Sequence, residues 1–99
     1  MQRSLKYLRE QGYRCFITEH FAFRKKHDLF GFTDILCLRG EEILAVQTTT
    51  RSNVSARVNK IKECEEVDFV RKAGIRIVVH GWGYMARSKK WELKEVDLS

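Results

Sequence analysis

The chain has 99 residues with no proline and six glycines, a length that suits one domain over residues 1–99 and leaves no room for two. Hydrophobic residues make up 43% of the chain and charged residues 32%, proportions that are typical of a folded globular domain and that argue against disorder. The apolar runs are too short to span a bilayer, and the first residues lack the apolar core of a secretory signal. We therefore expect an intracellular protein without a membrane partner.

Basic residues outnumber acidic ones by 19 to 13, which leaves a formal charge of +6. The excess lies near the start, because residues 1–27 hold seven Lys or Arg against two Glu. A basic surface attracts polyanions, of which DNA and RNA are the commonest, although it can also be a merely solvated surface. Charge alone therefore favours a nucleic-acid partner.

The three cysteines, Cys15, Cys37 and Cys64, lie within apolar patterns and form no Cys-x-x-Cys pair. Buried free thiols in a reducing compartment are expected. The histidines add no recognised ligand spacing, so a zinc site is not predicted.

The hydrophobic pattern predicts seven elements in the order α-β-β-β-α-β-β. In chain order these are expected at residues 3–11, 13–19, 33–39, 42–50, 54–73, 75–80 and 90–98. An exposed loop is predicted over 21–32 and a turn over 81–89. The strands at 33–39 and 42–50 are apolar on both faces, which is typical of the centre of an α/β sheet. The predicted fold is thus α/β, with a central mixed sheet flanked by helices.

The predicted hairpin places three polar residues together. If Gly40-Glu41 is a two-residue turn, the numbers of paired residues sum to 81, and Asp34 lies directly opposite Gln47. Thr49 follows on the same face two residues later. This end of the hairpin either emerges into solvent or forms a site where a carboxylate and a carboxamide oxygen share a hard cation with DNA phosphate.

These features, taken in order, resemble the PD-(D/E)xK nuclease superfamily, in which an Asp and a Glu-x-Lys lie on adjacent strands before a helix. The likeness is closest to archaeal Holliday junction resolvases and small phage-encoded relatives, and it covers nearly the whole chain. It is carried by the stretches DLFGFTD (28–34), QTTTRSNVSAR (47–57), HGW (80–82) and WEL (91–93).

The resemblance implies a restriction-endonuclease-like core, two ligands for Mg²⁺ or Mn²⁺ on the hairpin, and a Lys that orients the attacking water. Asp34 matches the Asp of the pattern, whereas Gln47 stands where a Glu is usual and Thr49 where the Lys is usual. The implied metal ligands are Asp34, Gln47 and the Thr48 carbonyl. Gln2 stands about where resolvases carry a further Glu.

The absent Lys leaves the source of positive charge open. Thr49 could only position water, and the candidates for the cation are Arg51, Arg57 and Lys60, each of which can equally be an ordinary solvated residue. Glu19 can face the same site, but its orientation is left open by the loop that follows.

Further residues are expected to contact DNA. Arg24, Lys25, Lys26 and His27 could clamp the backbone, and Asn53 could bind phosphate at a helix start, although an N-cap role alone explains it. The full expected set is Arg3, Arg24, Lys25, Lys26, His27, Arg51 and Asn53.

The sequence thus predicts a metal-dependent endonuclease for branched or duplex DNA, similar to a Holliday junction resolvase. The alternative is a non-catalytic DNA-binding domain that keeps the nuclease fold, which the residues at 47 and 49 favour. A resolvase cuts two strands, so a homodimer is expected, with Trp82 or Phe23 at its interface. If the protein is phage-encoded, it would act in the cytoplasm of an infected cell.

Overall fold

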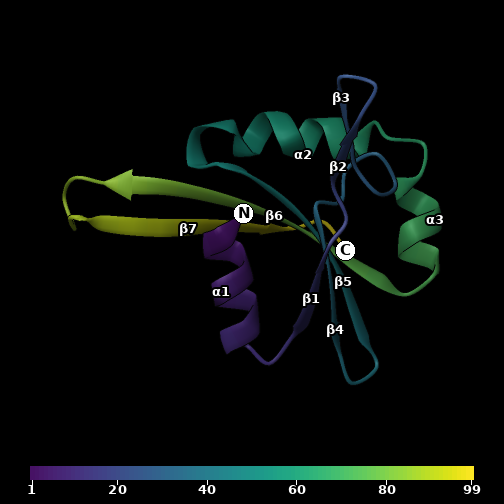
Figure 1. Ribbon diagram of the computed structural model, residues 1–99, viewed down its shortest axis with the longest axis horizontal. Coiled ribbons are helices and arrows are strands. Elements are labelled where there is room, and N and C mark those ends of the chain that lie inside the picture. The colour runs from purple at the N-terminus through teal and green to yellow at the C-terminus, as the bar shows by residue number, and fades with distance from the viewer.

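The computed structural model describes all residues from 1 to 99 (Figure 1). The elements in chain order are α1 (Gln2–Glu10), β1 (Arg14–Ile17), β2 (His20–Ala22), β3 (Lys25–His27), β4 (Ile35–Arg39), β5 (Glu42–Thr50), the 3₁₀ turn η1 (Arg51–Asn53), α2 (Val54–Lys62), α3 (Val67–Lys72), β6 (Ile75–Met85) and β7 (Lys90–Asp97). None of the helices combines the length and the apolar character that crossing a bilayer requires.

Five strands form one mixed sheet in the order β1-β4-β5-β6-β7, and β2 and β3 form a separate two-stranded ribbon. Strands β5 and β6 are parallel, so the chain crosses over between them through η1, α2 and α3. The other neighbouring pairs of the main sheet are antiparallel. The predicted α/β fold with a mixed sheet between helices is therefore confirmed.

The predicted hairpin at Gly40-Glu41 is also confirmed. Arg39 pairs with Glu42 and Ile35 with Val46, so the numbers of paired residues sum to 81 as expected for a two-residue turn. Gly40 has a φ of 57°, a conformation that glycine adopts without a steric penalty.

Each face of the sheet carries its own hydrophobic core. On one face α1 buries Leu5 and Leu8 against a cluster that includes Val46 and Val78. On the other face the helices α2 and α3 cover a cluster that includes Ala45 and Ile77 (Figure 1). Successive residues of a strand point to opposite faces, so the doubly apolar pattern of β4 and β5 follows from burial on both sides.

The predicted loop over 21–32 is wrong in its first half, because β2 and β3 form there. Phe23 and Arg24 make the two-residue turn of this ribbon, with φ values of 53° and 61°. A turn with two left-handed residues matches the twist of a hairpin but normally uses Asn or Gly. Phe-Arg gives no such signal, so the sequence pattern does not reveal the ribbon.

The predicted helix over 54–73 is two helices, interrupted at 63–66. The buried residues Ile61 and Val67 are six positions apart, a spacing that would place them on different sides of one continuous helix. Asn53 precedes α2, but its side chain makes no capping hydrogen bond, contrary to the predicted N-cap.

The predicted turn over 81–89 is mostly strand, since β6 continues to Met85. A Cβ added to Gly81 would lie 2.1 Å from Val54 Cγ2. Gly81 therefore marks the close approach of η1 and α2 to the sheet, and not a turn. The predicted strands over 13–19 and 33–39 are shorter, at Arg14–Ile17 and Ile35–Arg39, while β7 lies close to its expected range.

All three cysteines are free thiols, as expected. Cys37 is buried, whereas Cys15 and Cys64 are only partly buried. Cys15 and Cys37 are cross-strand partners on β1 and β4, with their sulfur atoms 3.7 Å apart.

Candidate functional site

Asp34 lies immediately before β4 and is fully buried. Its Oδ2 accepts hydrogen bonds from the backbone N–H of Thr48, at 2.9 Å, and from the Thr48 hydroxyl, at 3.1 Å. The carboxylate thus takes the place that a further residue of β4 would occupy beside β5. These two hydrogen bonds fix Oδ2 of Asp34, whereas Oδ1 accepts no hydrogen bond from Thr48.

The register slips by one residue at Asp34. Its backbone N–H donates to the Val46 carbonyl, whereas a sum of 81 would pair it with Gln47, and the ladder ends at Ile35–Val46. The predicted ladder pair of Asp34 and Gln47 therefore does not form. Gln47 instead lies between Val46 and Thr48, the two residues of β5 that hydrogen-bond to Asp34.

Two further carboxylates approach Asp34. One carboxylate oxygen from each of Glu19, Asp28 and Asp34 lies within 4.8 Å of the other two, and we call these three residues the acidic cluster. Glu19 comes directly before β2 and Asp28 directly after β3. Because His20 pairs with His27 in the ribbon, Glu19 and Asp28 emerge side by side at its base. The ribbon thus brings both carboxylates to Asp34.

Lys26 of β3 contacts all three members of the acidic cluster. Its Nζ lies 2.9 Å from Glu19 Oε2, 3.2 Å from Asp34 Oδ1 and 3.6 Å from Asp28 Oδ1. Burial lowers the pKa of Lys26, but its hydrogen bond to Glu19 and the charge of Asp34 outweigh that effect, so the pKa lies above the ordinary 10.5. Lys26 is therefore a firmly charged ammonium group.

The acidic cluster keeps an excess of negative charge, because one ammonium faces three carboxyl groups. The pKa of Asp28 is raised above its ordinary 3.8, since burial and the neighbouring Asp34 both disfavour its charged form. A second cation would relieve this repulsion. The environment therefore favours binding of positive charge.

Four buried oxygens near the site are poorly satisfied. Thr33 Oγ1 and Gln47 Oε1 have no hydrogen-bond donor, and Asp28 Oδ1 and Asp34 Oδ1 face only the ammonium group of Lys26. Leaving a buried acceptor unpaired is unfavourable, and carboxylate and carboxamide oxygens are the ligands that hard divalent cations prefer. The donor set at this end of β5 therefore fits Mg²⁺ or Mn²⁺.

The other residues predicted to supply positive charge do not reach the acidic cluster. Arg51 packs along Gly83 of β6, where an added Cβ would lie 2.9 Å from the Arg51 Cβ. Arg57 and Lys60 lie on α2 and make no ion pair. Thr49 pairs with Gly81 in the parallel ladder. Lys26 alone supplies a cation.

The predicted DNA contacts lie on different parts of the surface. The Arg3 guanidinium stacks on the Trp91 ring, 3.8 Å from its centroid, on the side of α1 and β7. Arg24 and Lys25 are exposed on the ribbon, while the His27 ring stacks on that of His20. Asn53 is exposed at the start of α2. The predicted contacts thus come from three separate parts of the fold, namely α1, η1 and the ribbon.

Sequence reasoning assigned no site role to Asp28 and expected Lys26 to contact DNA, not carboxylates. The two-residue turn at Phe23-Arg24 pairs residues whose numbers sum to 47, which places Glu19 opposite Asp28. Because Phe-Arg is not a usual turn sequence, no signal in the sequence indicated this pairing.

A second buried polar cluster lies between α1 and the sheet. Ser4 Oγ is 3.0 Å from His80 Nδ1, and His80 Nε2 is 2.7 Å from Glu95 Oε2. The Trp82 indole N–H donates to Ser4 Oγ at 2.8 Å. A serine, a histidine and a carboxylate in line are the groups of a hydrolase triad. Ser4 and His80 are fully buried, however, so no substrate reaches the hydroxyl and the cluster is structural.

His80 makes folding stability depend on pH. Burial lowers its pKa below the ordinary 6.5, although Glu95 partly opposes the shift. The native state thus favours neutral His80, and this contribution is complete above pH 6.5 and is lost as pH falls through the lowered pKa. We expect the unfolding free energy to fall between pH 7.5 and 5.5 by up to about 1.4 kcal/mol per pH unit below the unfolded pKa.

Urea unfolding of the parent and of His80→Gln at these two pH values measures the effect. His80→Gln should be less stable at pH 7.5 but should lose less stability at pH 5.5, whereas the exposed control His20→Gln should behave as the parent. Equal losses in the parent and His80→Gln would show that His80 is not the responsible group.

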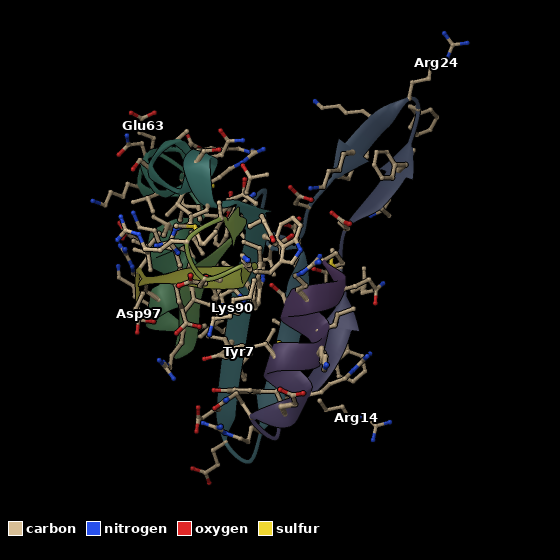
Figure 2. The ribbon with its side chains drawn as sticks, turned by 90° about the vertical axis from the view of Figure 1, so that its left-hand side faces the viewer. Tyr7, Arg14, Arg24, Glu63, Lys90 and Asp97 are labelled. Atoms are coloured by element: carbon tan, nitrogen blue, oxygen red, sulfur yellow. The ribbon has the colours of Figure 1, made fainter.

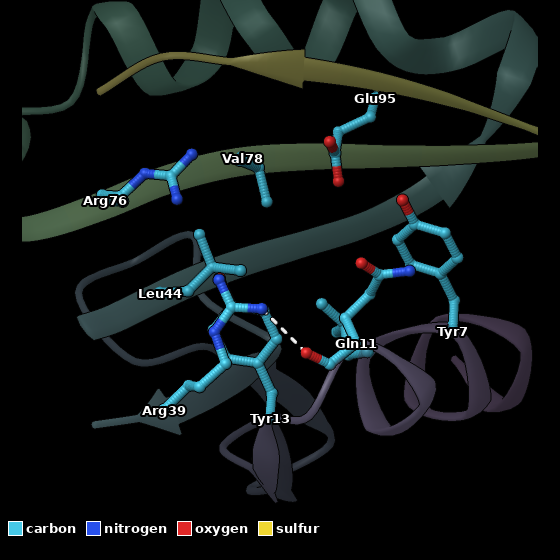
Figure 3. A pocket seen from close by; sticks show the side chains of 9 residues that line it. Tyr7, Gln11, Tyr13, Arg39, Leu44, Arg76, Val78 and Glu95 are labelled. Atoms are coloured by element: carbon cyan, nitrogen blue, oxygen red, sulfur yellow. Dashed lines mark hydrogen bonds between the residues drawn. The ribbon is translucent and has the colours of Figure 1, made fainter. Parts of the chain in front are cut away.

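A hollow of about 130 Å³ lies between α1 and the sheet (Figure 3). It contains Arg39 and Arg76, but both are engaged, Arg39 with Gln11 and Glu42, and Arg76 with Asp97. Ligand pockets usually measure about 300–1,000 Å³, so this hollow is too small for a substrate. No member of the acidic cluster lines it.

Comparison with protein-family models, with curated proteins and with solved structures found no match for this chain.

Proposed function

We propose that the chain is a divalent-metal-dependent DNA endonuclease with a restriction-endonuclease-like core, acting on branched DNA as Holliday junction resolvases do. The observation that carries the proposal is the fully buried Asp34 carboxylate, fixed by Thr48 on one oxygen and turned toward Glu19 and Asp28 with the other. A buried carboxylate among other carboxylates is unfavourable for folding, so such an arrangement is commoner at functional sites.

Asp34, Gln47 and Thr48 would hold the metal ion. The N–H of Thr48 points toward Asp34, and the carbonyl of the same residue projects toward the same side of β5. Gln47 contributes a neutral oxygen where the nuclease pattern has a carboxylate, and Glu19 or Asp28 offsets that loss of negative charge. When bound, the metal would polarise the scissile phosphate and lower the pKa of a water molecule.

Lys26 would take the part of the lysine that is missing at position 49. It reaches the acidic cluster from β3, whereas the lysine of the pattern would reach it from β5. Its ammonium group would orient the attacking water and stabilise the charge that develops on the phosphate. Arg57 and Lys60, the cations predicted from the sequence, are not needed for this step.

A labelled four-way junction, a duplex of the same sequence and a single strand test the proposal in Mg²⁺, in Mn²⁺ and in EDTA. We expect cleavage of the junction in both metals and none in EDTA. Absence of cleavage in all conditions would overturn the proposal. If the junction were nevertheless bound, the non-catalytic DNA-binding alternative would hold, which Gln47, Thr49 and the ammonium already within the acidic cluster favour.

The homodimer expected of a resolvase stays a prediction. Light scattering of the free protein and of its junction complex should report two copies of the chain. A monomer in both states would leave nicking of one strand as the activity.

A further inference from the structure

We infer that the tip of the ribbon, Phe23 with Arg24, is a stacking wedge that inserts at the branch point of DNA. The inference rests on the proposed function and adds the feature of the substrate that the protein recognises. Figure 2 shows Arg24 at the far end of the ribbon, well away from the rest of the molecule. The Phe23 side chain is 98% exposed and that of Phe21 is 76% exposed.

The tip residues are poor choices for the turn itself. Phe23 and Arg24 both adopt left-handed φ values, a conformation that is unfavourable for a residue with a side chain. Asn-Gly would form the same turn without this penalty. An exposed aromatic ring therefore stands at a strained position where it contributes nothing to folding, and strain of this kind is common at binding sites.

The charge of the ribbon identifies the partner as an anion. Between His20 and His27 there is no acidic residue, and Arg24 and Lys25 are exposed and form no ion pair. Lys26 meanwhile anchors the base of the ribbon to the acidic cluster. A rigid basic arm with an aromatic tip fits a polyanion that also offers flat apolar faces, which describes unstacked nucleic-acid bases.

Branched DNA offers such faces more readily than intact duplex. In a duplex each base is stacked on both sides, and inserting a side chain requires unfavourable unstacking of a base step. At a branch point the terminal base pairs have an open face, so Phe23 can stack there without that cost. Stacking on an aromatic ring is favourable for any base, because every base has a flat π-face.

Fluorescence anisotropy in EDTA tests the wedge without any cleavage. We expect the parent to bind the four-way junction more tightly than the matched duplex. Phe23→Asn should weaken junction binding by about fivefold or more, the equivalent of at least about 1 kcal/mol, and leave duplex binding unchanged. Asn adopts left-handed φ readily, so this variant keeps the turn. Phe69→Ala, which removes another exposed ring on α3, should change neither affinity.

An unchanged ratio of junction to duplex affinity in Phe23→Asn would overturn the inference. If this variant also converted a dimer to a monomer in light scattering, Phe23 would instead contact a second copy of the chain. Loss of junction preference in a protein that cleaves nothing would support the wedge and refute the nuclease. If cleavage required Asp34 but Phe23→Asn kept the parental preference for the junction, the nuclease would be supported and the wedge refuted.

Discussion

Asp34→Asn is expected to lower metal-dependent DNA cleavage by about 1,000-fold or more, which corresponds to about 4 kcal/mol of transition-state stabilisation. The substitution keeps the size of the side chain but removes a full negative charge from a fully buried position. An amide also cannot satisfy its neighbours. Its oxygen can face either the Thr48 donors or the Lys26 ammonium, and its NH₂ group then faces the remaining donor.

Single-turnover cleavage of the four-way junction measures this loss, with Asp68→Asn as the matched control. Asp68 lies exposed on α3 and pairs only with Arg71, so its variant should cleave at the parental rate. Circular dichroism should show that both variants are folded. Cleavage by Asp34→Asn at a rate within a few-fold of the parent would place the active site elsewhere.

Lys26→Met is expected to separate catalysis from metal binding. Lys26 is the only cation within the acidic cluster, so its loss should lower the cleavage rate by about 100-fold, as loss of a preorganised stabilising group typically does. The same ammonium competes with a divalent ion for Asp34 Oδ1 and Glu19 Oε2. Removing it should therefore tighten Mn²⁺ binding even though cleavage slows.

Calorimetric titration with Mn²⁺ and single-turnover cleavage give the two quantities, and Lys72→Met is the control. Lys72 is exposed on α3 and forms no ion pair, so its variant should leave both quantities near the parental values. Lys26→Arg should retain part of the activity because the charge remains. If Lys26→Met cleaved as fast as the parent, Lys26 would only anchor the ribbon.

The parts of the fold that follow from local patterns could be predicted. Gly40-Glu41 between two apolar runs sets a two-residue turn, and the turn sets the register of β4 and β5. The alternation of Ala45 and Val46 between the two cores likewise follows from the period of a strand. The same pattern predicts Asp34 at the polar end of this pair, and Asp34 does lie there, directly before Ile35 of β4.

The parts of the fold and of the site that depend on tertiary contacts could not be predicted from the sequence. Asp34 leaves the register of β4 and β5 because its carboxylate, and not a backbone carbonyl of β4, accepts the hydrogen bond from the Thr48 N–H. A hydrophobic pattern does not predict such a side-chain hydrogen bond. Gly81 looks like a turn residue in sequence but allows Val54 to approach the sheet. Lys26 and Asp28 join the site through a ribbon whose turn, Phe23-Arg24, lacks the usual residues. No sequence pattern therefore indicated Lys26 as the cation that we propose in place of a lysine at position 49.

We propose that Asp34, Gln47 and Thr48 bind a divalent metal ion beside Glu19 and Asp28, and paramagnetic broadening by Mn²⁺ in the ¹H–¹⁵N spectrum of the intact chain tests this proposal most directly. Substoichiometric Mn²⁺ should broaden the amide signals of Glu19, Asp28, Asp34 and Thr48 first and leave those of Ser88 and Lys89, in the turn between β6 and β7, sharp. The effect should vanish in Asp34→Asn and persist in Asp68→Asn. Uniform broadening, or broadening that survives Asp34→Asn, would contradict a metal site at Asp34.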